Sequence, residues 1–357
     1  MRICFFADSE SIHTVRWCNH FKEAGHEVHL ISFKSANVPG VSNYFVETNN
    51  ISVNGGNWKV LLKFSKVKKL VKQIKPDIFH ALYATSYGIT GALCGFKPYI
   101  ITALGSDLLI SPKNSKIYRH LLKYAFSKSQ LITVMSDQMK IEAENLGVPA
   151  SKVMTLPFGI DPKVFNSKDR KLDVSKFVVT STRNFETIYN IPHLLYAIEK
   201  VKDKIPNLHL NLIGTGSLKD ELENLVKKLE LENIVTFFGR IPQPEIAEIL
   251  NKSNVFVSVS LSDGNNISLN EAMACETFCI ATDIPANRQW IKHKENGFLV
   301  EINDVDSLAE YILKSSENYD ELQQKSLSLS RKLIEEKGIW EVNMNRMEGE
   351  YKRLANL

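Results

Sequence analysis

The sequence of 357 residues contains little cysteine and no hydrophobic run long enough to cross a membrane. Its five cysteines show no repeated spacing, and Cys275 and Cys279 have no neighbours that would complete a metal site. Buried, reduced thiols are therefore expected, which is typical of a cytosolic protein. The best candidate for a membrane span, residues 84–104, is interrupted by glycines, Lys97 and Pro98. The N-terminus reaches Asp8 without the apolar stretch of a signal peptide, so we expect a cytoplasmic protein.

Acidic residues are scarce in the first part of the chain. Residues 1–165 contain 20 Lys+Arg and 11 Asp+Glu, a charge of +9, and the remainder contains 24 and 29, a charge of −5. A basic half indicates an anionic partner. Nucleic acid is not expected, because no recognition motif or aromatic platform is present. Weak attraction to an anionic membrane fits better, which would place the protein at the inner face of the plasma membrane.

Two segments, 58–75 and 108–136, contain no acidic residue at all and carry apolar residues at helical spacing. The apolar positions are Leu61, Phe64, Val67, Leu70, Val71 and Ile74 in the first segment, and Ile117, Leu121, Leu122 and Phe126 in the second. Basic amphipathic helices either lie on a membrane surface or pack on their own sheet and leave the lysines in solvent. We expect these apolar stripes to belong to the core.

Short apolar runs alternate with helix-length segments along the whole chain, a pattern that predicts βαβ units and parallel sheets. The expected strands are 2–7, 27–31, 77–82, 99–103, 131–135, 177–180, 208–213, 235–238, 255–258 and 279–281. A Pro- and Gly-containing segment at 157–162 and a polar stretch at 166–173 separate two series of strands. We therefore expect Rossmann-like domains at 1–165 and 166–335. A C-terminal helix at 336–357 would pack back on the first domain.

The most informative segment is 260–274, where a strand is followed by a Gly/Asn loop and then by helix-favouring residues. Amides at a helix start lack intrahelical partners and lie at the positive end of the dipole, so they can hold a phosphate or a sugar hydroxyl. Asp263 and Glu271 flank these amides. The alternative is purely structural: Asp263 is a turn former and Glu271 is a first-turn helix charge.

Asp263 and Glu271, with seven residues between them, resemble the paired acids of the retaining glycosyltransferases of family 4, and residues 271–275 also match that family. Within that family, the chain resembles the glycosyltransferases of bacterial surface-polysaccharide and glycan assembly. Further segments fit the family pattern in the expected order, namely 25–28, 76–81, 105–107, 136–137, 158–161, 214–216, 238–240, 282–288 and 296–300, together with Arg183. The resemblance covers almost the whole chain.

This resemblance implies a GT-B fold, an α/β architecture of two Rossmann-like, doubly wound parallel-sheet domains that face a cleft. The N-terminal domain would bind the acceptor, and the C-terminal domain would bind the nucleotide-sugar donor. By position, Glu271 should bind the ribose, Asp263 the transferred sugar, and Arg183 the diphosphate. The other donor contacts implied are the amides of Asn266, Ile267 and Ser268, then Gly214, with Gly239 and Arg240 beside the base.

The chain departs from the family pattern at several of these positions. The first acid is commonly Glu, and here it is the shorter Asp263. A Lys that usually follows Arg183 and shares the diphosphate is missing from 184–190, so we expect Arg16 or loop amides to replace it. A His that often precedes Gly105 is Leu104 here, which leaves His80, Asp107 or His13 to contact the reacting sugar.

Three of these residues also have plain structural readings. His13 and Arg16 follow the first strand and could contact phosphate or acceptor, yet Ser11 could simply cap a helix beside a solvated Arg16. His80 ends a strand, where a hydrogen-bonded structural histidine is as reasonable as a sugar ligand. The sequence Asp304-Val-Asp306 imitates a metal-binding DxD motif, but it precedes a helix start, so we expect Asp304 to be a cap.

These observations predict a metal-independent, retaining hexosyltransferase without a cofactor. It would move a sugar from a nucleotide-sugar donor, with UDP as the first expectation, to a glycan or lipid-linked acceptor. The first alternative is a nucleotide-sugar epimerase, which would act without an acceptor. The second is a non-catalytic, nucleotide-binding subunit, suggested by the missing Lys and His.

Overall fold

The computed structural model describes residues 1–48 and 58–356. The chain divides into two compact units. The first unit comprises Met1–Pro157 and Met344–Leu357, and the second comprises Phe158–Asn343. Among the residues described, no helix is long and apolar enough to cross a membrane.

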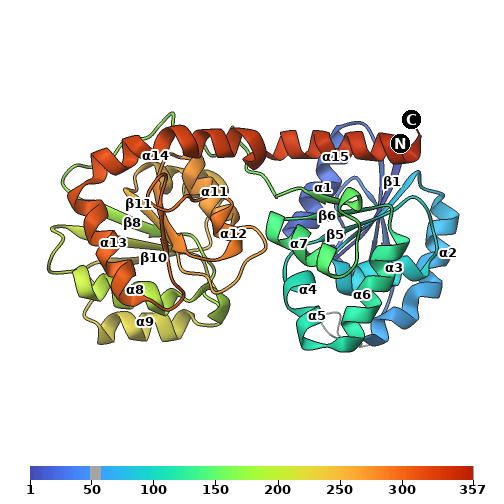
Figure 1. Ribbon diagram of the computed structural model, residues 1–357, viewed down its shortest axis with the longest axis horizontal. Coiled ribbons are helices and arrows are strands. Elements are labelled where there is room, and N and C mark those ends of the chain that lie inside the picture. Colours follow the sequence, from blue (N-terminus) through green and yellow to red (C-terminus); the bar gives the residue numbers. More distant parts are fainter. Residues whose placement is uncertain (49–57, 357) are drawn as a thin grey trace. The chain divides into compact units, whose positions relative to one another are not determined.

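The first unit is built on a parallel sheet of seven strands in the order β3-β2-β1-β4-β5-β6-β7. Strands β1, β5 and β6 of this sheet are labelled in Figure 1. The strands are β1 (Arg2–Phe6), β2 (Glu27–Ser32), β3 (Ser42–Phe45), β4 (Ile78–Leu82), β5 (Tyr99–Ala103), β6 (Leu131–Val134) and β7 (Val153–Thr155). The central strands β1, β4 and β5 are apolar along nearly their whole length because helices cover both faces of the sheet. The carboxyl ends of these strands therefore meet at one edge, where β4 leads to Tyr83 and β5 to Leu104, whereas His80 lies in the middle of β4.

The helices of the first unit connect its strands. They are α1 (Ile12–Glu23), η1 (Trp58–Lys63), α2 (Phe64–Ile74), η2 (Ala84–Gly88), α3 (Ile89–Leu93), α4 (Ser106–Leu109), α5 (Ser111–Asn114), α6 (Lys116–Lys128), α7 (Asp137–Asn145) and η3 (Ala150–Lys152). Gly25 ends α1 as expected: its φ is +84°, and it donates to Lys22 O while His26 donates to Phe21 O. A left-handed residue with this bond pair is the usual glycine helix end.

The second unit repeats the architecture with six parallel strands in the order β10-β9-β8-β11-β12-β13. The strands are β8 (Phe177–Ser181), β9 (Leu208–Ile213), β10 (Val235–Gly239), β11 (Val255–Ser258), β12 (Phe278–Thr282) and β13 (Phe298–Val300). Strands β8 and β11 are parallel neighbours at the centre of the sheet, and the strand order reverses between them. Their carboxyl ends lie at the same edge of the sheet. Ligands of doubly wound sheets bind at such a switch point, beyond the carboxyl ends of the strands.

The helices of the second unit cover both faces of its sheet. They are η4 (Thr187–Tyr189), α8 (Ile191–Val201), α9 (Lys219–Lys228), α10 (Gln243–Asn251), α11 (Ile267–Ala274), α12 (Pro285–Arg288), α13 (Val305–Glu317), α14 (Tyr319–Leu333) and η5 (Ile334–Gly338). One core cluster joins the sheet to α8, α9 and α13, and the other joins it to α10 and α11 around Trp290. These two cores fix the loops that follow β8 and β11.

The chain passes between the units at 157/158 and again at 343/344, in place of the boundaries at 165/166 and 335/336 expected from the sequence. Phe158 and Ile160 are buried within the second unit, and Ile160 forms a bridge with Ile339. These contacts place the two connecting segments, one after residue 157 and one before residue 344, in the second unit. Helix α15 (Trp340–Ala355) carries Met344, Met347 and Tyr351 into the core of the first unit.

Each expected strand is present to within one or two residues. Strands β3, β7 and β13 were not anticipated. They are short and lie at or next to a sheet edge, where fewer residues need to be apolar. The apolar stripes of α2 and α6 are confirmed as core at Val67, Val71 and Leu122, but Phe64 and Ile117 are exposed.

Candidate active site

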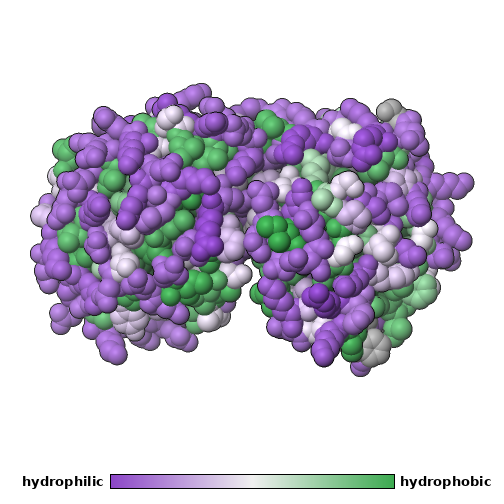
Figure 2. Space-filling view, in the orientation of Figure 1, coloured by the Kyte–Doolittle hydropathy of each residue, from purple (hydrophilic) through white to green (hydrophobic). Residues whose placement is uncertain are grey.

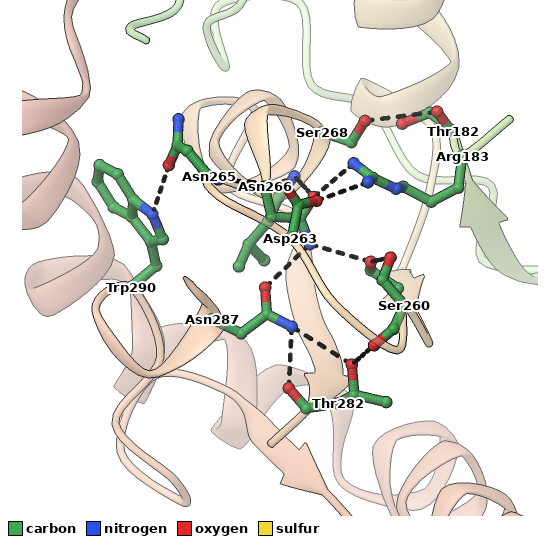
Figure 3. Close-up of polar contacts among 12 residues, drawn as sticks. Thr182, Arg183, Ser260, Asp263, Asn265, Asn266, Ser268, Thr282, Asn287 and Trp290 are labelled. Atoms are coloured by element: carbon green, nitrogen blue, oxygen red, sulfur yellow. Dashed lines mark hydrogen bonds and ion pairs between the residues drawn. The ribbon is translucent and has the colours of Figure 1, made fainter. Parts of the chain in front are cut away.

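Arg183 lies just beyond the carboxyl end of β8 and is almost completely buried, with 8% of its surface exposed. Its Nη2 donates to Oδ2 of Asp263 at 2.6 Å, and its Nη1 donates to Oδ1 of Asn266 at 3.0 Å (Figure 3). The sequence places these partners about 80 residues apart, and the switch point of the sheet brings them together. A buried guanidinium with a carboxylate partner remains charged and well oriented.

Asn266 is the hub of this network and is fully buried. It caps α11, since its Oδ1 also accepts the N–H of Leu269 at 3.2 Å. Its Nδ2 donates to Ser258 Oγ at 2.9 Å and to Asn287 Oδ1 at 3.0 Å (Figure 3). One side chain therefore links the end of β11, the start of α11, and α12.

The loop between β11 and α11 is held from two further directions. Asp263 Oδ1 accepts the N–H of Asn265 at 3.1 Å, which is a turn-forming contact. The side chain of Asn265 donates to the carbonyl of Phe158 at 3.1 Å and accepts from Trp290 Nε1 at 3.1 Å. The turn reading of Asp263 is therefore confirmed, and the same carboxylate also holds Arg183.

Helix α11 begins at Ile267, and Ser268 lies in its first turn. Amides at a helix start have no intrahelical acceptor and can serve an anion. Here the N–H of Ile267, one of the expected donor contacts, donates to the carbonyl of Asn265 at 3.0 Å. Ser268 Oγ donates to the carbonyl of Thr182 at 3.4 Å, which joins the helix start to the end of β8. Glu271 follows one turn later and is 7% exposed. Cation, amides and two carboxylates thus lie on two adjoining segments of one unit.

Gly214, an expected donor contact, directly follows β9, and Gly239, expected beside the base, is the last residue of β10. Gly214 follows β9 with φ +150°, and a Cβ there would be 2.7 Å from the carbonyl oxygen of Arg183. Gly214 donates to the carbonyl of Gly239 at 2.9 Å, and Gly239 has φ +67°. Arg240 is exposed beside them. Gly214 therefore permits close packing of backbone against Arg183.

Tyr189 was given no role by sequence reasoning. The guanidinium carbon of Arg183 lies 4.2 Å from the centroid of its ring, a cation–π contact. The periodicity and motifs of the sequence carry no signal for this contact. The same is true of the contacts that Asn266 makes with Arg183 and Asn287, because these depend on loops that meet only in the folded unit.

His80 was predicted as a possible sugar contact, and the structure corrects this. The side chain is completely buried in the first unit. Its Nδ1 hydrogen-bonds with Tyr351 Oη at 2.5 Å, and its Nε2 with Thr102 Oγ1 at 2.7 Å. Burial lowers the pKa of His80 to about 3, so the imidazole is neutral at physiological pH. The structural reading of His80 is correct.

Asp107 was also predicted to contact the reacting sugar, but it too is completely buried. Its Oδ2 accepts the N–H of Ala84 at 2.6 Å, and its Oδ1 accepts the N–H groups of Leu104 at 3.0 Å and Gly105 at 2.8 Å. Burial raises the pKa of Asp107, and these three amides oppose the shift. Asp107 therefore shapes the loops after β4 and β5 and does not present a carboxylate to a ligand.

His13 and Arg16 lie in the first two turns of α1, beyond the carboxyl end of β1. Burial and the nearby charge of Arg16 lower the pKa of His13 to about 4. The imidazole is therefore neutral at pH 7. The position after β1 agrees with the expected one, while the ligand role of both residues stays a prediction.

Two descriptions of known protein families match this chain. The one described as glycosyl transferase 4-like matches residues 2–136, and the one described as glycosyl transferases group 1 matches residues 163–332. The chain belongs to the family 4 glycosyltransferases. The match covers both units, and the expected family is confirmed.

Two curated relatives of this glycosyltransferase are N-acetyl-alpha-D-glucosaminyl L-malate synthase of Bacillus anthracis and UDP-Gal:alpha-D-GlcNAc-diphosphoundecaprenol alpha-1,3-galactosyltransferase of Escherichia coli. The first is 26% identical over 82% of this chain and 80% of its own length. The second is 26% identical over 70% of this chain and 69% of its own length. Both support the assignment to glycan biosynthesis.

Solved structures confirm the fold. Sucrose-phosphate synthase from Thermosynechococcus elongatus superimposes with a TM-score of 0.82 at 18% identity, covering 99% of each chain. Anabaena HepE in complex with UDP gives a TM-score of 0.80 at 16% identity, covering 99% of this chain and all of HepE. The predicted fold class, two Rossmann-like domains of the GT-B type, is therefore correct.

Three further features of the glycosyltransferase bear on its candidate sites. Over residues 1–48 and 58–356, no group of three or more His, Cys, Asp or Glu side chains is arranged to hold a metal ion. Asp304, from the DxD-like sequence, accepts the N–H of Ser307 at 2.9 Å and caps α13, as expected. A cavity of about 850 Å³ between β8–β10 and α10 contains none of the predicted donor residues among its lining side chains.

Proposed function

We propose that this glycosyltransferase is a retaining hexosyltransferase that uses a nucleotide-sugar donor, with UDP as the expected nucleotide. The second unit would hold the donor, and the first would hold a glycan or lipid-linked saccharide acceptor. The donor is consumed as a substrate, and no cofactor is required. The UDP named for the Escherichia coli relative and for the HepE complex supports the choice of nucleotide.

One observation carries this proposal: the buried Arg183 beside the N-terminus of α11. When the bond between the anomeric carbon and the diphosphate breaks, negative charge develops on the departing oxygens. A fixed guanidinium and the amides of a helix start are pre-organised donors for that charge, and such groups usually contribute more to catalysis than any other single effect. Arg183 and the amides near Ser268 would supply this stabilisation without a divalent ion.

The remaining donor contacts follow from position in the family. Glu271 would accept hydroxyls of the ribose, and the carboxylate of Asp263 would accept hydroxyls of the transferred sugar. Each carboxylate oxygen has two acceptor sites, so the contacts of Asp263 with Arg183 and Asn265 leave capacity for a sugar hydroxyl. Retention by same-face substitution would use the departing phosphate oxygen to deprotonate the acceptor.

The first unit offers a surface for an anionic membrane that carries a lipid-linked acceptor. Lysines of α2 and α6 are exposed, and so are apolar side chains of the same part of the unit, including Leu62 of η1 at 64% and Ile117 of α6 at 70%. In Figure 2, hydrophobic residues lie among hydrophilic ones on the visible face of this unit. Basic residues near such a surface each contribute about 1 kcal/mol at low salt.

A panel of nucleotide sugars tests the donor proposal. Thermal unfolding of the full chain is followed with UDP-, GDP- and ADP-sugars, because a ligand of the native state raises the apparent melting temperature. The stabilising donor is then incubated with candidate acceptors, and the anomeric configuration of the product is read by NMR. We expect UDP-sugars to stabilise the protein, an α-linked product from an α-linked donor, and activity that survives EDTA.

Each rival outcome is distinct. Conversion of the donor without an acceptor would indicate an epimerase, and nucleotide binding without any release would indicate a non-catalytic subunit. An inverted product would contradict retention, and activity lost to EDTA and restored by a divalent ion would contradict metal independence. Glu271→Ala should abolish stabilisation by the donor, whereas Asp263→Ala should mainly slow transfer. Normal turnover by both variants would overturn the assigned roles.

Co-sedimentation with vesicles tests the membrane proposal. We expect binding to vesicles that contain anionic lipid, weaker binding at high salt, and little binding to neutral vesicles. Replacing Lys66, Lys69 and Lys72 of α2 by Gln should weaken binding, while replacing the exposed Lys227 and Lys228 of α9 should not. Equal binding by both variants would contradict a specific basic face.

A further inference from the structure

The segment that lacks the family's second cation supplies an aromatic ring instead. Residues 184–190 contain no Lys. Within this segment, the ring of Tyr189 lies under the guanidinium of Arg183, with 4.2 Å between the guanidinium carbon and the ring centroid. A ring face attracts a cation, and the attraction grows when the pair is shielded from water.

Three contacts from different directions define the position of this guanidinium. Asp263 holds Nη2, Asn266 holds Nη1, and Tyr189 covers one face of the plane. Nε is buried and has no partner among the residues that the structure describes. A guanidinium has five N–H donors, so Nε and one hydrogen on each Nη nitrogen are left for an anion.

Tyr189 is itself held in place. It ends the short helix η4, in which its N–H donates to the carbonyl of Glu186 at 2.9 Å. The carbonyl of Ile188 accepts the N–H of Leu261, in the loop after β11, at 2.8 Å. Asn190 follows in a left-handed conformation, with φ of +53°. The backbone that carries the ring is therefore attached to the same loop that carries Asp263.

We propose that Tyr189 is a positioning residue that orients Arg183 for the diphosphate of the donor, so that one pre-organised cation serves where the family commonly uses two. This inference rests on the proposed function. An arginine side chain loses considerable rotamer freedom when it binds an anion, and a side chain already ordered by its neighbours loses less. Tyr189 lowers that cost without adding charge.

Binding of UDP and uridine to the full chain tests the proposal, because uridine lacks the diphosphate. Titration calorimetry measures UDP, and ligand-observed NMR measures uridine; GDP and guanosine replace them if the panel selects GDP. The variants are Tyr189→Leu, which removes the ring, and Tyr189→Phe, which keeps it. Tyr196→Leu on α8, an exposed tyrosine of the same unit, is the matched control.

We expect Tyr189→Leu to weaken UDP binding about three- to thirty-fold, the range of a partly shielded cation–π contact. Uridine affinity should change less than twofold, and Tyr189→Phe and Tyr196→Leu should behave as the wild type. In an Arg183→Ala background, Tyr189→Leu should have no further effect, because the pair is coupled.

Three results would overturn the proposal: unchanged UDP affinity in Tyr189→Leu, an equal loss of uridine affinity, or an undiminished effect without Arg183. The second result would make Tyr189 a contact of the nucleoside, and the third would make it act independently of Arg183. A wild-type chain that binds neither UDP nor GDP would overturn the proposed function together with this inference. Binding by the wild type with any of the three results would overturn this inference alone.

Discussion

At the scale of single residues, the structure assigns different tasks to charged groups that look alike in the sequence. Asp107 lies in the first turn of α4, after β5, and Asp263 lies in the loop between β11 and α11. The carboxylate of Asp107 accepts hydrogen bonds from three backbone amides, whereas that of Asp263 accepts from a guanidinium and one amide. The difference arises from burial. The carboxylate of Asp107 has no contact with solvent, so its hydrogen bonds must come from the protein, and nearby backbone N–H groups donate them.

Arg183→Lys should lower kcat about 10²- to 10³-fold, with a smaller change in KM for the donor. The ammonium of Lys is a point charge and cannot hold Asp263, Asn266 and a diphosphate in one plane. Steady-state kinetics with the donor chosen by the thermal panel measures the effect. Arg353→Lys, at an exposed position of α15, is the control. A value of kcat within threefold of the wild type would contradict the role of Arg183.

His80 should make the protein less stable in acid. Its folded pKa is about 3 and its ordinary value is 6.5. The unfolded chain therefore takes up the proton first, and the stability that neutral His80 contributes is present above about pH 6.5 and is lost as pH falls toward 3. The slope from this group is at most about 1.4 kcal/mol per pH unit.

Urea unfolding of wild type and His80→Gln at pH 7, 6 and 5 checks this prediction. The variant should be less stable at pH 7, because the contacts with Tyr351 and Thr102 are altered, but its stability should depend less on pH. His120→Gln on α6 should retain the wild-type slope, since His120 is exposed. A His80→Gln slope equal to that of the wild type would show that other groups control acid stability.

At the scale of elements, the N-caps of two helices differ in what they support. Asn266 caps α11 and also joins Arg183, Ser258 and Asn287. Asp304 caps α13 near the surface. Both residues have the sequence signature of a cap, but only the cap of α11 lies at the switch point of its sheet.

Asn266→Ala should lower the free energy of unfolding by about 2–4 kcal/mol, because it removes a cap and leaves buried partners unsatisfied. It should also lower kcat, since Arg183 loses one of its fixed contacts. Asp304→Ala should cost about 1 kcal/mol and leave kcat unchanged. Denaturant unfolding and kinetics on the same samples separate the two effects. Equal kinetic effects in both variants would contradict a special role for the α11 cap.

At the scale of the whole molecule, the chain leaves the first unit at residue 157 and returns to it at residue 344. The returning segment is not peripheral. Met344, Met347 and Tyr351 are completely buried, and Tyr351 packs against Phe21 and hydrogen-bonds with His80. The first unit is therefore completed by the last residues of the sequence.

Deleting residues 344–357 should strongly destabilise the first unit. Each large buried side chain removed costs about 2–5 kcal/mol, and three of them are comparable with the whole stability of a domain. Limited proteolysis with mass spectrometry should show early cleavage within residues 1–157 and a longer-lived fragment from the second unit. Deleting only residues 356–357 should leave the pattern unchanged. Equal proteolysis of both truncations would contradict this assignment.

The strand series, the two Rossmann-like domains and the family could be predicted from the sequence. Buried parallel strands must be apolar along their length, and Gly25, Asp304 and the Asp263–Glu271 pair carry local rules that act within a few residues. The same rules failed for β3, β7 and β13, because these edge strands are only three or four residues long, and so short a segment shows no periodicity that identifies a strand.

The sequence by itself determined the alternation of strands and helices and the uneven charge of the chain, since these depend on composition and local periodicity. Only the tertiary structure decided which polar residues are buried among backbone partners and which gather around Arg183. It buried His80 and Asp107 within the first unit and brought Asp263, Asn266 and Tyr189 to Arg183. The reason is physical: burial and hydrogen-bond partners are set by loops distant in sequence that meet at a sheet edge, and no local pattern encodes that meeting.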